Sequence, residues 1–216
     1  MQLDPERGYD LIGDIHGCGH ALARLLDQLG YRLQGGVWRH PRRQVIFLGD
    51  IIDRGPHIRE ALHLVHAMVD HGQAHCIMGN HEFNALGWYM PAPPGSGRDF
   101  VREHSPRFAR LLQETFQQFE HYPEEWKAFR EWFYDLPLFL ETERFRVVHA
   151  CWDSRVIARL RPLLNDGRIN PAILREAGLP GTFICQALDR LLRGTDMPLP
   201  EGMTLTSEEG FVRTFF

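Results

Sequence analysis

Short apolar runs alternate with longer amphipathic segments along the first half of the chain. Continuous apolar character over about four residues is typical of a strand buried on both faces, and three such runs stand at 9–12, 45–48 and 75–78. Apolar residues that recur every three or four positions predict helices, here over 21–29, 56–69 and 83–90. Because strands that alternate with helices form largely parallel sheets, we predict an α/β fold with a central, largely parallel sheet flanked by helices.

The pattern is helical from about residue 96 to residue 135. Ser105 and Pro106 form a helix cap followed by a first-turn proline, and a second helix is predicted to start near Pro123. The aromatic stripe of this second helix is better explained as core than as a stacking platform. It consists of Trp126, Phe129, Trp132 and Phe133. We interpret the stretch 96–135 as a helical insertion within a single domain of residues 1–216.

Three shorter elements are predicted outside these regions. Residues 31–39 alternate around a glycine turn and predict a small β-hairpin. A strand over 145–148 ends at His149 and is expected to resume the sheet, and residues 183–192 predict a helix.

The composition is that of a soluble globular protein. Of the 216 residues, 44% are hydrophobic and 24% are charged, and no window approaches the roughly 20 consecutive apolar residues of a membrane span. The first seven residues contain no apolar segment of the signal-peptide type. We therefore expect a cytoplasmic protein without a membrane partner.

The composition also argues against certain metal sites, disulfides and nucleic acid partners. The four cysteines are widely spaced and form no Cys-x-x-Cys pair, which argues against a thiolate zinc site and a disulfide framework. The net charge of −4 disfavours long nucleic acids, whose partners usually carry a basic surface. Twelve histidines are many for this length, but His63 and His66, three positions apart on one predicted helix, are better explained as surface residues than as metal ligands.

Three polar motifs follow the three predicted strands. They are GDIHG at 13–17, GDIIDRGP at 49–56 and GNHE at 79–82, and His149 follows a fourth strand. An isolated Gly-Asp pair more often ends a strand or caps a helix, and a lone histidine is more often a hydrogen-bonded core residue. Loops at the carboxyl ends of parallel strands gather at one edge of the sheet, however. Oxygen and imidazole ligands without thiolate suit Mn²⁺, Fe²⁺ or Zn²⁺, so the motifs together predict a metal site.

These motifs resemble the three signatures of the calcineurin-like metallophosphoesterases, in particular those of the phosphoprotein-phosphatase branch. The resemblance extends over about residues 9–150 and implies a metallophosphoesterase-type fold. DRGP at 53–56 and HACWD at 149–153 are similar to the small bacterial serine/threonine phosphatases and to the symmetrical dinucleoside tetraphosphatases.

The resemblance implies a centre of two divalent metal ions, with Mn²⁺ expected first and Fe²⁺ or Zn²⁺ as alternatives. By the same resemblance Asp14 and His16 bind the first ion, Asp50 bridges both, and Asn80 and His149 bind the second. A carboxylate can bridge two cations, and an asparagine carbonyl is a neutral ligand. A hydroxide bridging the two ions is then the nucleophile, which attacks phosphorus without a covalent enzyme intermediate.

Three further residues receive roles from the resemblance. Arg54 is expected to bind the phosphate of the substrate, because its planar guanidinium matches two phosphate oxygens. His81 is expected to act as the general acid that protonates the leaving oxygen, and Asp53 to orient His81.

Three functions remain open on these grounds. The first is hydrolysis of a phosphomonoester, with phosphoserine and phosphothreonine as candidate substrates. The second is symmetrical hydrolysis of diadenosine tetraphosphate, which would use the same centre. The third, from another class, is a metal-binding regulatory protein with impaired turnover.

The chain also departs from the family pattern. Family members supply one more histidine to the second metal, in a Gly-His motif after the position of His149, and this chain has no later histidine. Residues 210–216 resemble the beginning of a strand without a partner. We therefore expect an amino-terminal portion of a longer protein, without the carboxyl-terminal part of the fold. Arg193 and Arg213 are candidates for a second phosphate-binding arginine.

Overall fold

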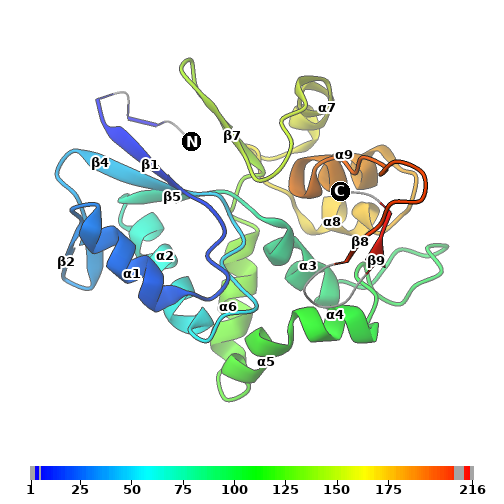
Figure 1. Ribbon diagram of the computed structural model, residues 1–216, viewed down its shortest axis with the longest axis horizontal. Helices are drawn as coiled ribbons and strands as arrows, with labels where there is room; N and C mark the ends of the chain where they lie inside the picture. The colour runs from blue at the N-terminus through cyan, green and yellow to red at the C-terminus, as the bar shows by residue number, and fades with distance from the viewer. Residues whose placement is uncertain (1–2, 5, 207–211, 215–216) are drawn as a thin grey trace.

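A three-stranded parallel sheet forms the centre of the fold (Figure 1). The structure is a computed structural model that describes residues 3–4, 6–206 and 212–214. The strands lie in the order β1 (Gly8–Ile12), β4 (Arg43–Phe47) and β5 (Ala74–Cys76), with Leu11 opposite Ile46 and Phe47 opposite Cys76. This confirms the three predicted strands and their parallel arrangement.

The two faces of the sheet are covered differently. Helices α1 (Gly19–Gln28) and α2 (Ile58–Asp70) lie together against one face, as predicted (Figure 1). On the other face, a hairpin of β6 (Phe139–Glu141) and β7 (Arg146–Val148) buries Leu140 and Val147 against Ile46 and Ile77. The predicted strand at 145–148 therefore exists, but it pairs antiparallel with β6 and does not join the parallel sheet.

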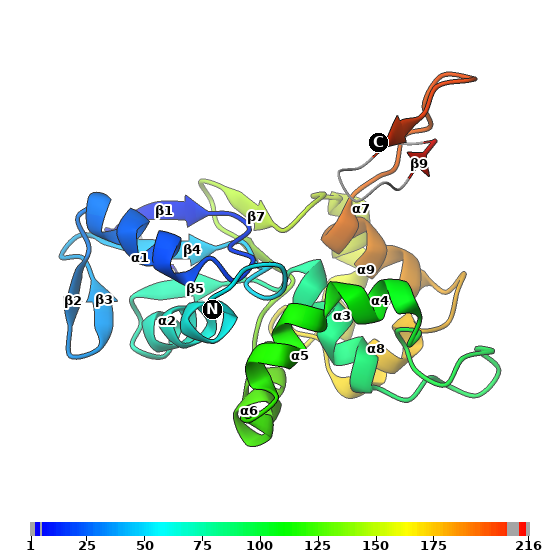
Figure 2. The ribbon, with the colours of Figure 1, turned by 60° about the horizontal axis from the view of Figure 1, so that its bottom comes forward.

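The remaining elements are mostly helical. The predicted hairpin is β2 (Arg32–Gln34) with β3 (Val37–Arg39), and it lies at the end of the molecule opposite the helices that follow β5 (Figure 2). Those helices are α3 (Asn80–Tyr89), α4 (Pro106–Leu111), α5 (Gln113–Phe119), α6 (Pro123–Phe133), α7 (Ser154–Leu160), α8 (Pro171–Ala177) and α9 (Phe183–Arg193). A short 3₁₀ turn, Arg161–Leu163, follows α7. The aromatic stripe of α6 is core, as predicted, with Trp126, Phe129 and Phe133 buried.

The predicted strand at 210–216 is described only in part. A short pair of strands, β8 (Leu205–Thr206) and β9 (Val212–Arg213), runs antiparallel, while residues 210, 211, 215 and 216 lie outside the described part of the chain. Within the described residues, none of the helices combines the length and apolar character that crossing a bilayer requires.

An ion pair links α6 to α2. Arg59 donates two hydrogen bonds to the Glu125 carboxylate, at 3.1 and 2.8 Å, and His63 Nε2 lies 2.8 Å from the same carboxylate. His66 packs edge-on against Trp132. His63 and His66 thus contact side chains of α6, and of the two only His63 is the exposed residue that was predicted.

Replacing Glu125 with glutamine is expected to lower the free energy of unfolding at pH 7 by about 0.5–1 kcal/mol, the range of a partly exposed ion pair. The hydrogen bonds from Arg59 lower the pKa of Glu125, outweighing burial, which raises it. Because the folded-state pKa is lowered, this stabilisation is present above the usual value of 4.5 and is lost as the pH falls through the lowered value.

Urea unfolding at pH 7 and near pH 3 measures this difference. Glu124→Gln is the matched control, because Glu124 is exposed on the same helix turn. A Glu125→Gln effect that is as large at pH 3 as at pH 7 would contradict the assignment to an ion pair.

Candidate metal centre

The predicted ligands come together where the strands end. Asp14 follows β1, Asp50 follows β4, and His149 follows β7. Donor atoms of Asp14, Asp50 and His149 lie within 4.8 Å of one another, and so do those of His16, Asp50 and His81. Asp50 belongs to both groups, which is the position expected of a bridging ligand.

Hydrogen bonds to the backbone determine how the two predicted histidine ligands point. His16 Nδ1 lies 3.0 Å from the Ile52 carbonyl oxygen, and His149 Nδ1 lies 2.6 Å from the Leu48 carbonyl oxygen. A carbonyl can only accept, so Nδ1 carries the proton in both rings. Nε2 is left as the ligand atom, as is usual for histidines that bind metal.

Three imidazoles present Nε2 to one oxygen of Asp50. The distances to Asp50 Oδ2 are 3.8 Å from His16, 3.8 Å from His81 and 3.4 Å from His149. His16 Nε2 also lies 3.7 Å from Asp14 Oδ2. Separations of 3.7–3.8 Å exceed a hydrogen bond but are close to the sum of two metal–ligand bonds of about 2 Å each. The donor set and its spacing therefore fit divalent ions with oxygen and nitrogen ligands.

Asn80 also fits this interpretation. Its side-chain oxygen lies 3.0 Å from His149 Nε2 and 3.3 Å from both Asp50 Oδ2 and the Leu192 carbonyl oxygen. Asp50 Oδ2 and the Leu192 carbonyl oxygen are acceptors, so the Asn80 oxygen beside them needs either a turned amide or a cation. A cation bound by Asn80, Asp50 and His149 would satisfy all three groups.

The charges at the centre are strongly interdependent. Asp50 is buried, and burial raises its pKa, but His149 and His81 outweigh this effect and keep the pKa low. Burial likewise lowers the pKa of His149, while its contacts with Asp50 raise it to about 9. In the metal-free chain the Asp50 carboxylate is therefore balanced by imidazolium, a positive charge that bound metal would replace.

Helix α3 begins earlier than predicted, and this matters for the site. The sequence pattern predicts a start at residue 83, whereas Asn80 and His81 already lie in the first turn. The His81 backbone N–H donates to Asp50 Oδ1 at 3.0 Å. The amino-terminal end of α3 thus stabilises the negative charge of Asp50.

His81 is held by a buried chain of hydrogen bonds. Its Nδ1 lies 2.6 Å from Asp53 Oδ2, and Thr115 Oγ1 donates to Asp53 Oδ1 at 2.5 Å. Thr115 Oγ1 also accepts from the Asp53 backbone N–H at 3.1 Å. Burial lowers the pKa of His81, but the hydrogen bond to Asp53 and the charges of Asp50 and Asp53 together outweigh it, so the pKa is raised. This arrangement keeps a proton on His81 and directs Nε2 towards the centre, as the predicted general acid requires.

Sequence reasoning did not assign a function to Thr115. The residue stands on the apolar stripe of α5, where its β-branched side chain resembles ordinary core. The available signal was a hydroxyl among apolar residues on one helix face, since buried hydroxyls need a partner. The partner is 62 positions away along the chain, so sequence alone could not identify it.

Replacing Thr115 with valine is expected to lower kcat about 10–100-fold, the usual effect of removing a group that orients a catalytic side chain. Valine keeps the shape but cannot donate to Asp53, so His81 loses its fixed orientation. Thr115→Ser is the control, because it keeps the hydroxyl and should retain most of the activity. A folded Thr115→Val protein with normal kcat would show that Asp53 does not depend on Thr115.

Glu82 joins the loop after β4 to the loop after β5. Its carboxylate is fully buried and accepts backbone N–H groups from Asp50 and Ile51 at 2.8 Å each and from Gly79 at 3.0 Å. The two loops approach so closely that a Cβ on Gly49, where φ is +89°, would lie 2.3 Å from the Gly79 backbone nitrogen. The glycines of both motifs are therefore required for the loops to meet around Glu82.

The backbone is strained at several of the predicted site residues. Positive φ angles occur at His16 (43°), Asp50 (52°), Asp53 (71°) and Arg54 (67°). Such angles are unfavourable for residues with a Cβ and are usually found where side-chain placement matters for function. The loops around Glu82 thus hold these side chains in positions that an unstrained chain would not choose.

The predicted arginines have different surroundings. Arg54 is exposed, and its charge contributes, after burial and His81, to the lowered pKa of His16, which places it beside the centre. Arg193 Nη2 donates to Asn84 Oδ1 at 3.2 Å, one helical turn beyond Asn80. The Arg213 side chain lies outside the part of the chain that the structure describes.

A family model described as "Calcineurin-like phosphoesterase" matches residues 9–174 of the chain. A bis(5'-nucleosyl)-tetraphosphatase PrpE [asymmetrical] of Oceanobacillus iheyensis is 32% identical over 142 residues, which cover 65% of this chain and 54% of that protein. The protein of the same description from Halalkalibacterium halodurans is 46% identical over 83 residues, 38% of this chain and 33% of that one. The chain thus spans about half or less of the length of these relatives.

A solved structure has a similar fold. A cold-active protein tyrosine phosphatase superposes with a TM-score of 0.51 at 20% identity, covering 89% of this chain and 56% of that structure. At this level of identity the likeness concerns the fold alone.

Proposed function

Because the chain belongs to the calcineurin-like phosphoesterases, we propose that it hydrolyses dinucleoside tetraphosphates at the centre described above. The observation that carries this proposal is the convergence of three Nε2 atoms on Asp50 Oδ2 at 3.4–3.8 Å. Similarity to the PrpE tetraphosphatases supports a dinucleoside substrate over the phosphomonoester expected first. Those relatives are described as asymmetrical, so we propose asymmetrical cleavage in place of the symmetrical cleavage expected from the resemblance.

In this proposal, two divalent ions are held by five residues, and Mn²⁺, Fe²⁺ and Zn²⁺ all suit these ligands. The ligands are Asp14, His16, Asp50, Asn80 and His149. When bound, the ions supply Lewis-acid stabilisation of the charge that develops at phosphorus. The site assignments, the cytoplasmic location and the absence of a nucleic acid partner stay predictions.

Substrate binding and proton transfer are assigned to other residues of the chain. Arg54 binds and orients the phosphate that is attacked, through its fork of N–H donors. His81 gives the proton on Nε2 to the leaving oxygen, while Asp53 and Thr115 keep the ring in position through Nδ1.

Product analysis tests the proposal. Diadenosine tetraphosphate is incubated with the chain and Mn²⁺, and the nucleotides are separated by ion-exchange chromatography, with a phosphoserine peptide treated in parallel. ATP and AMP in equal amounts support asymmetrical cleavage, whereas ADP alone would replace it with symmetrical cleavage. Hydrolysis of the phosphopeptide without cleavage of the dinucleotide would restore the phosphomonoester interpretation. Metal binding without turnover of either substrate would favour a regulatory protein.

A further inference from the structure

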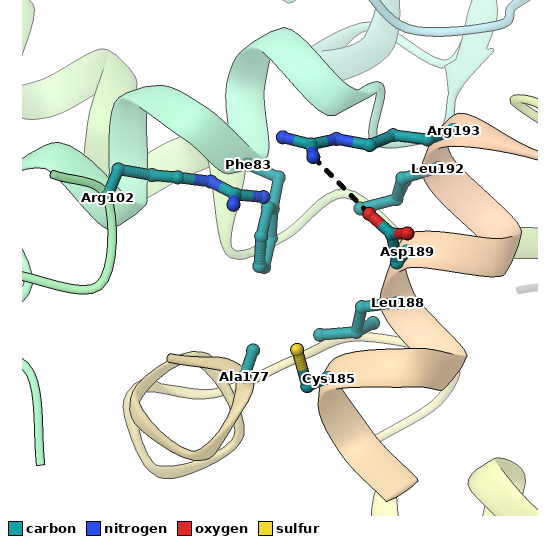
Figure 3. Close-up of a pocket in the computed structure, with 8 residues that line it drawn as sticks. All are labelled: Phe83, Arg102, Ala177, Cys185, Leu188, Asp189, Leu192 and Arg193. Atoms are coloured by element: carbon teal, nitrogen blue, oxygen red, sulfur yellow. Dashed lines mark ion pairs between the residues drawn. The ribbon is translucent and has the colours of Figure 1, made fainter. Parts of the chain in front are cut away.

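A small pocket lies beside the candidate metal centre, between α3, α8 and α9 (Figure 3). The pocket is open to solvent on one side, and Phe83, Leu188 and Leu192 form much of its apolar wall. The Leu192 carbonyl oxygen lies 3.3 Å from the Asn80 side chain. The pocket is therefore a neighbour of the second predicted metal position and is separate from Arg54.

Two arginines reach into this pocket from opposite sides (Figure 3). The Arg102 guanidinium lies over the Phe83 ring, 5.0 Å from its centroid. Arg193 comes from the end of α9 and forms an ion pair with Asp189 at 3.3 Å. The two guanidinium groups thus line one pocket, whose only carboxylate among the described lining residues is that of Asp189.

Arg102 lacks a polar partner. Within the described residues, its Nε is buried and donates to no acceptor. Burial and then the charge of Arg193 lower the pKa of Arg102 to about 9. Asp189 cannot compensate fully, because it is committed to Arg193 and its side chain is 58% exposed. Arg102 is partly buried and has no carboxylate of its own, which is costly for a cation, so the pocket carries excess positive charge that an anion would stabilise.

We propose that this pocket binds a phosphate group between Arg102 and Arg193. A phosphate offers enough oxygens to accept from two guanidinium forks at once, and its charge matches two cations better than that of a carboxylate. The apolar wall strengthens the attraction by excluding water. Resting on the proposed function, the phosphate is one that the substrate carries beyond the phosphorus under attack, which assigns Arg102 and Arg193 to recognition of the longer polyphosphate.

Calorimetric titration with inorganic phosphate tests this pocket. No metal is added, so that phosphate does not bind to ions at the metal centre. Arg102→Gln should weaken binding at least about 10-fold, the effect of losing charge-assisted hydrogen bonds. Asp189→Asn should tighten binding several-fold, because it removes the competing carboxylate. A misfolded variant would not bind more tightly, so this second change separates recognition from stability.

Arg130→Gln is the matched control. Arg130 also has a buried Nε without a partner and lies over the Tyr89 ring at 3.7 Å, but it stands on α6 and does not line the pocket. Its replacement should leave phosphate binding unchanged. Equal phosphate affinity in the wild type, Arg102→Gln and Asp189→Asn proteins would overturn the proposal.

A kinetic comparison distinguishes a substrate phosphate from free phosphate. With Mn²⁺ present, the ratio of kcat/KM for diadenosine tetraphosphate to that for p-nitrophenyl phosphate should fall at least about 10-fold in Arg102→Gln relative to Arg130→Gln. An unchanged ratio would overturn the assignment to the substrate. If the wild type does not cleave the tetraphosphate at all, the proposed function fails, and the phosphate titration still decides the pocket.

Discussion

Replacing His81 with alanine is expected to lower kcat about 10²–10⁴-fold, the usual contribution of a general acid, while the bound metal is retained. His81 presents Nε2 towards Asp50, and its Nδ1 is occupied by Asp53, which raises the pKa of His81 against the effect of burial. The ring therefore holds a proton at the atom that faces the reaction. Alanine removes this proton but none of the five predicted metal ligands.

The choice of substrate makes this prediction sharper. p-Nitrophenolate leaves readily without protonation, whereas phenolate does not, so the loss of kcat should be larger with phenyl phosphate than with p-nitrophenyl phosphate. His63→Ala is the control, because His63 is 59% exposed on α2. Equal losses with both substrates would show that His81 acts in another way than by protonating the leaving oxygen.

Replacing Asp50 with asparagine is expected to abolish tight metal binding and to lower kcat at least about 10³-fold, since metal ions contribute several kcal/mol to such reactions. Asp50 is shared by both ligand groups, and its Oδ2 is approached by all three imidazoles. Asparagine keeps the size but loses the charge and one ligand oxygen. The neighbouring cations would then lack the anion that balances them.

Metal content after dialysis and Mn²⁺-dependent kcat measure this effect together. Asp27→Asn serves as the control, because Asp27 is exposed and pairs with Arg32 away from the centre. An Asp50→Asn protein that keeps its metal and its activity would exclude Asp50 as the bridging ligand.

The parallel sheet, and the proximity of side chains that follow its strands, could be predicted because their signals are local. Each of the strands β1, β4 and β5 overlaps a short, mostly apolar run that ends at a glycine and a polar residue. The carboxyl ends of parallel strands meet at one edge, so the side chains after them had to be neighbours. The structure brings Asp14 and Asp50 together for this reason, whereas His149 joins them from the end of β7 in the separate antiparallel hairpin.

Other features depend on contacts that span the chain. Strand β6 was not predicted, because its residues Phe139–Glu141 are few and have no alternating pattern. Glu82 could be recognised as part of a motif, but its role in joining two loops emerges only when Asp50 and Gly79 lie side by side. Arg102 stands in an irregular loop. Its proposed role in phosphate binding depends on its lining the same pocket as Arg193, which is far away in the sequence.

The link between Thr115 and Asp53 has a consequence for how the protein loses activity. Helix α5 has only seven residues, too short to be stable without its tertiary contacts, and its Thr115 hydroxyl binds the carboxylate that orients His81. Local opening of such a segment requires less free energy than unfolding of a central sheet. On gradual addition of urea, hydrolysis should therefore cease before the far-ultraviolet circular dichroism changes. Activity measurements would report the local unfolding of α5 and would underestimate the stability of the sheet.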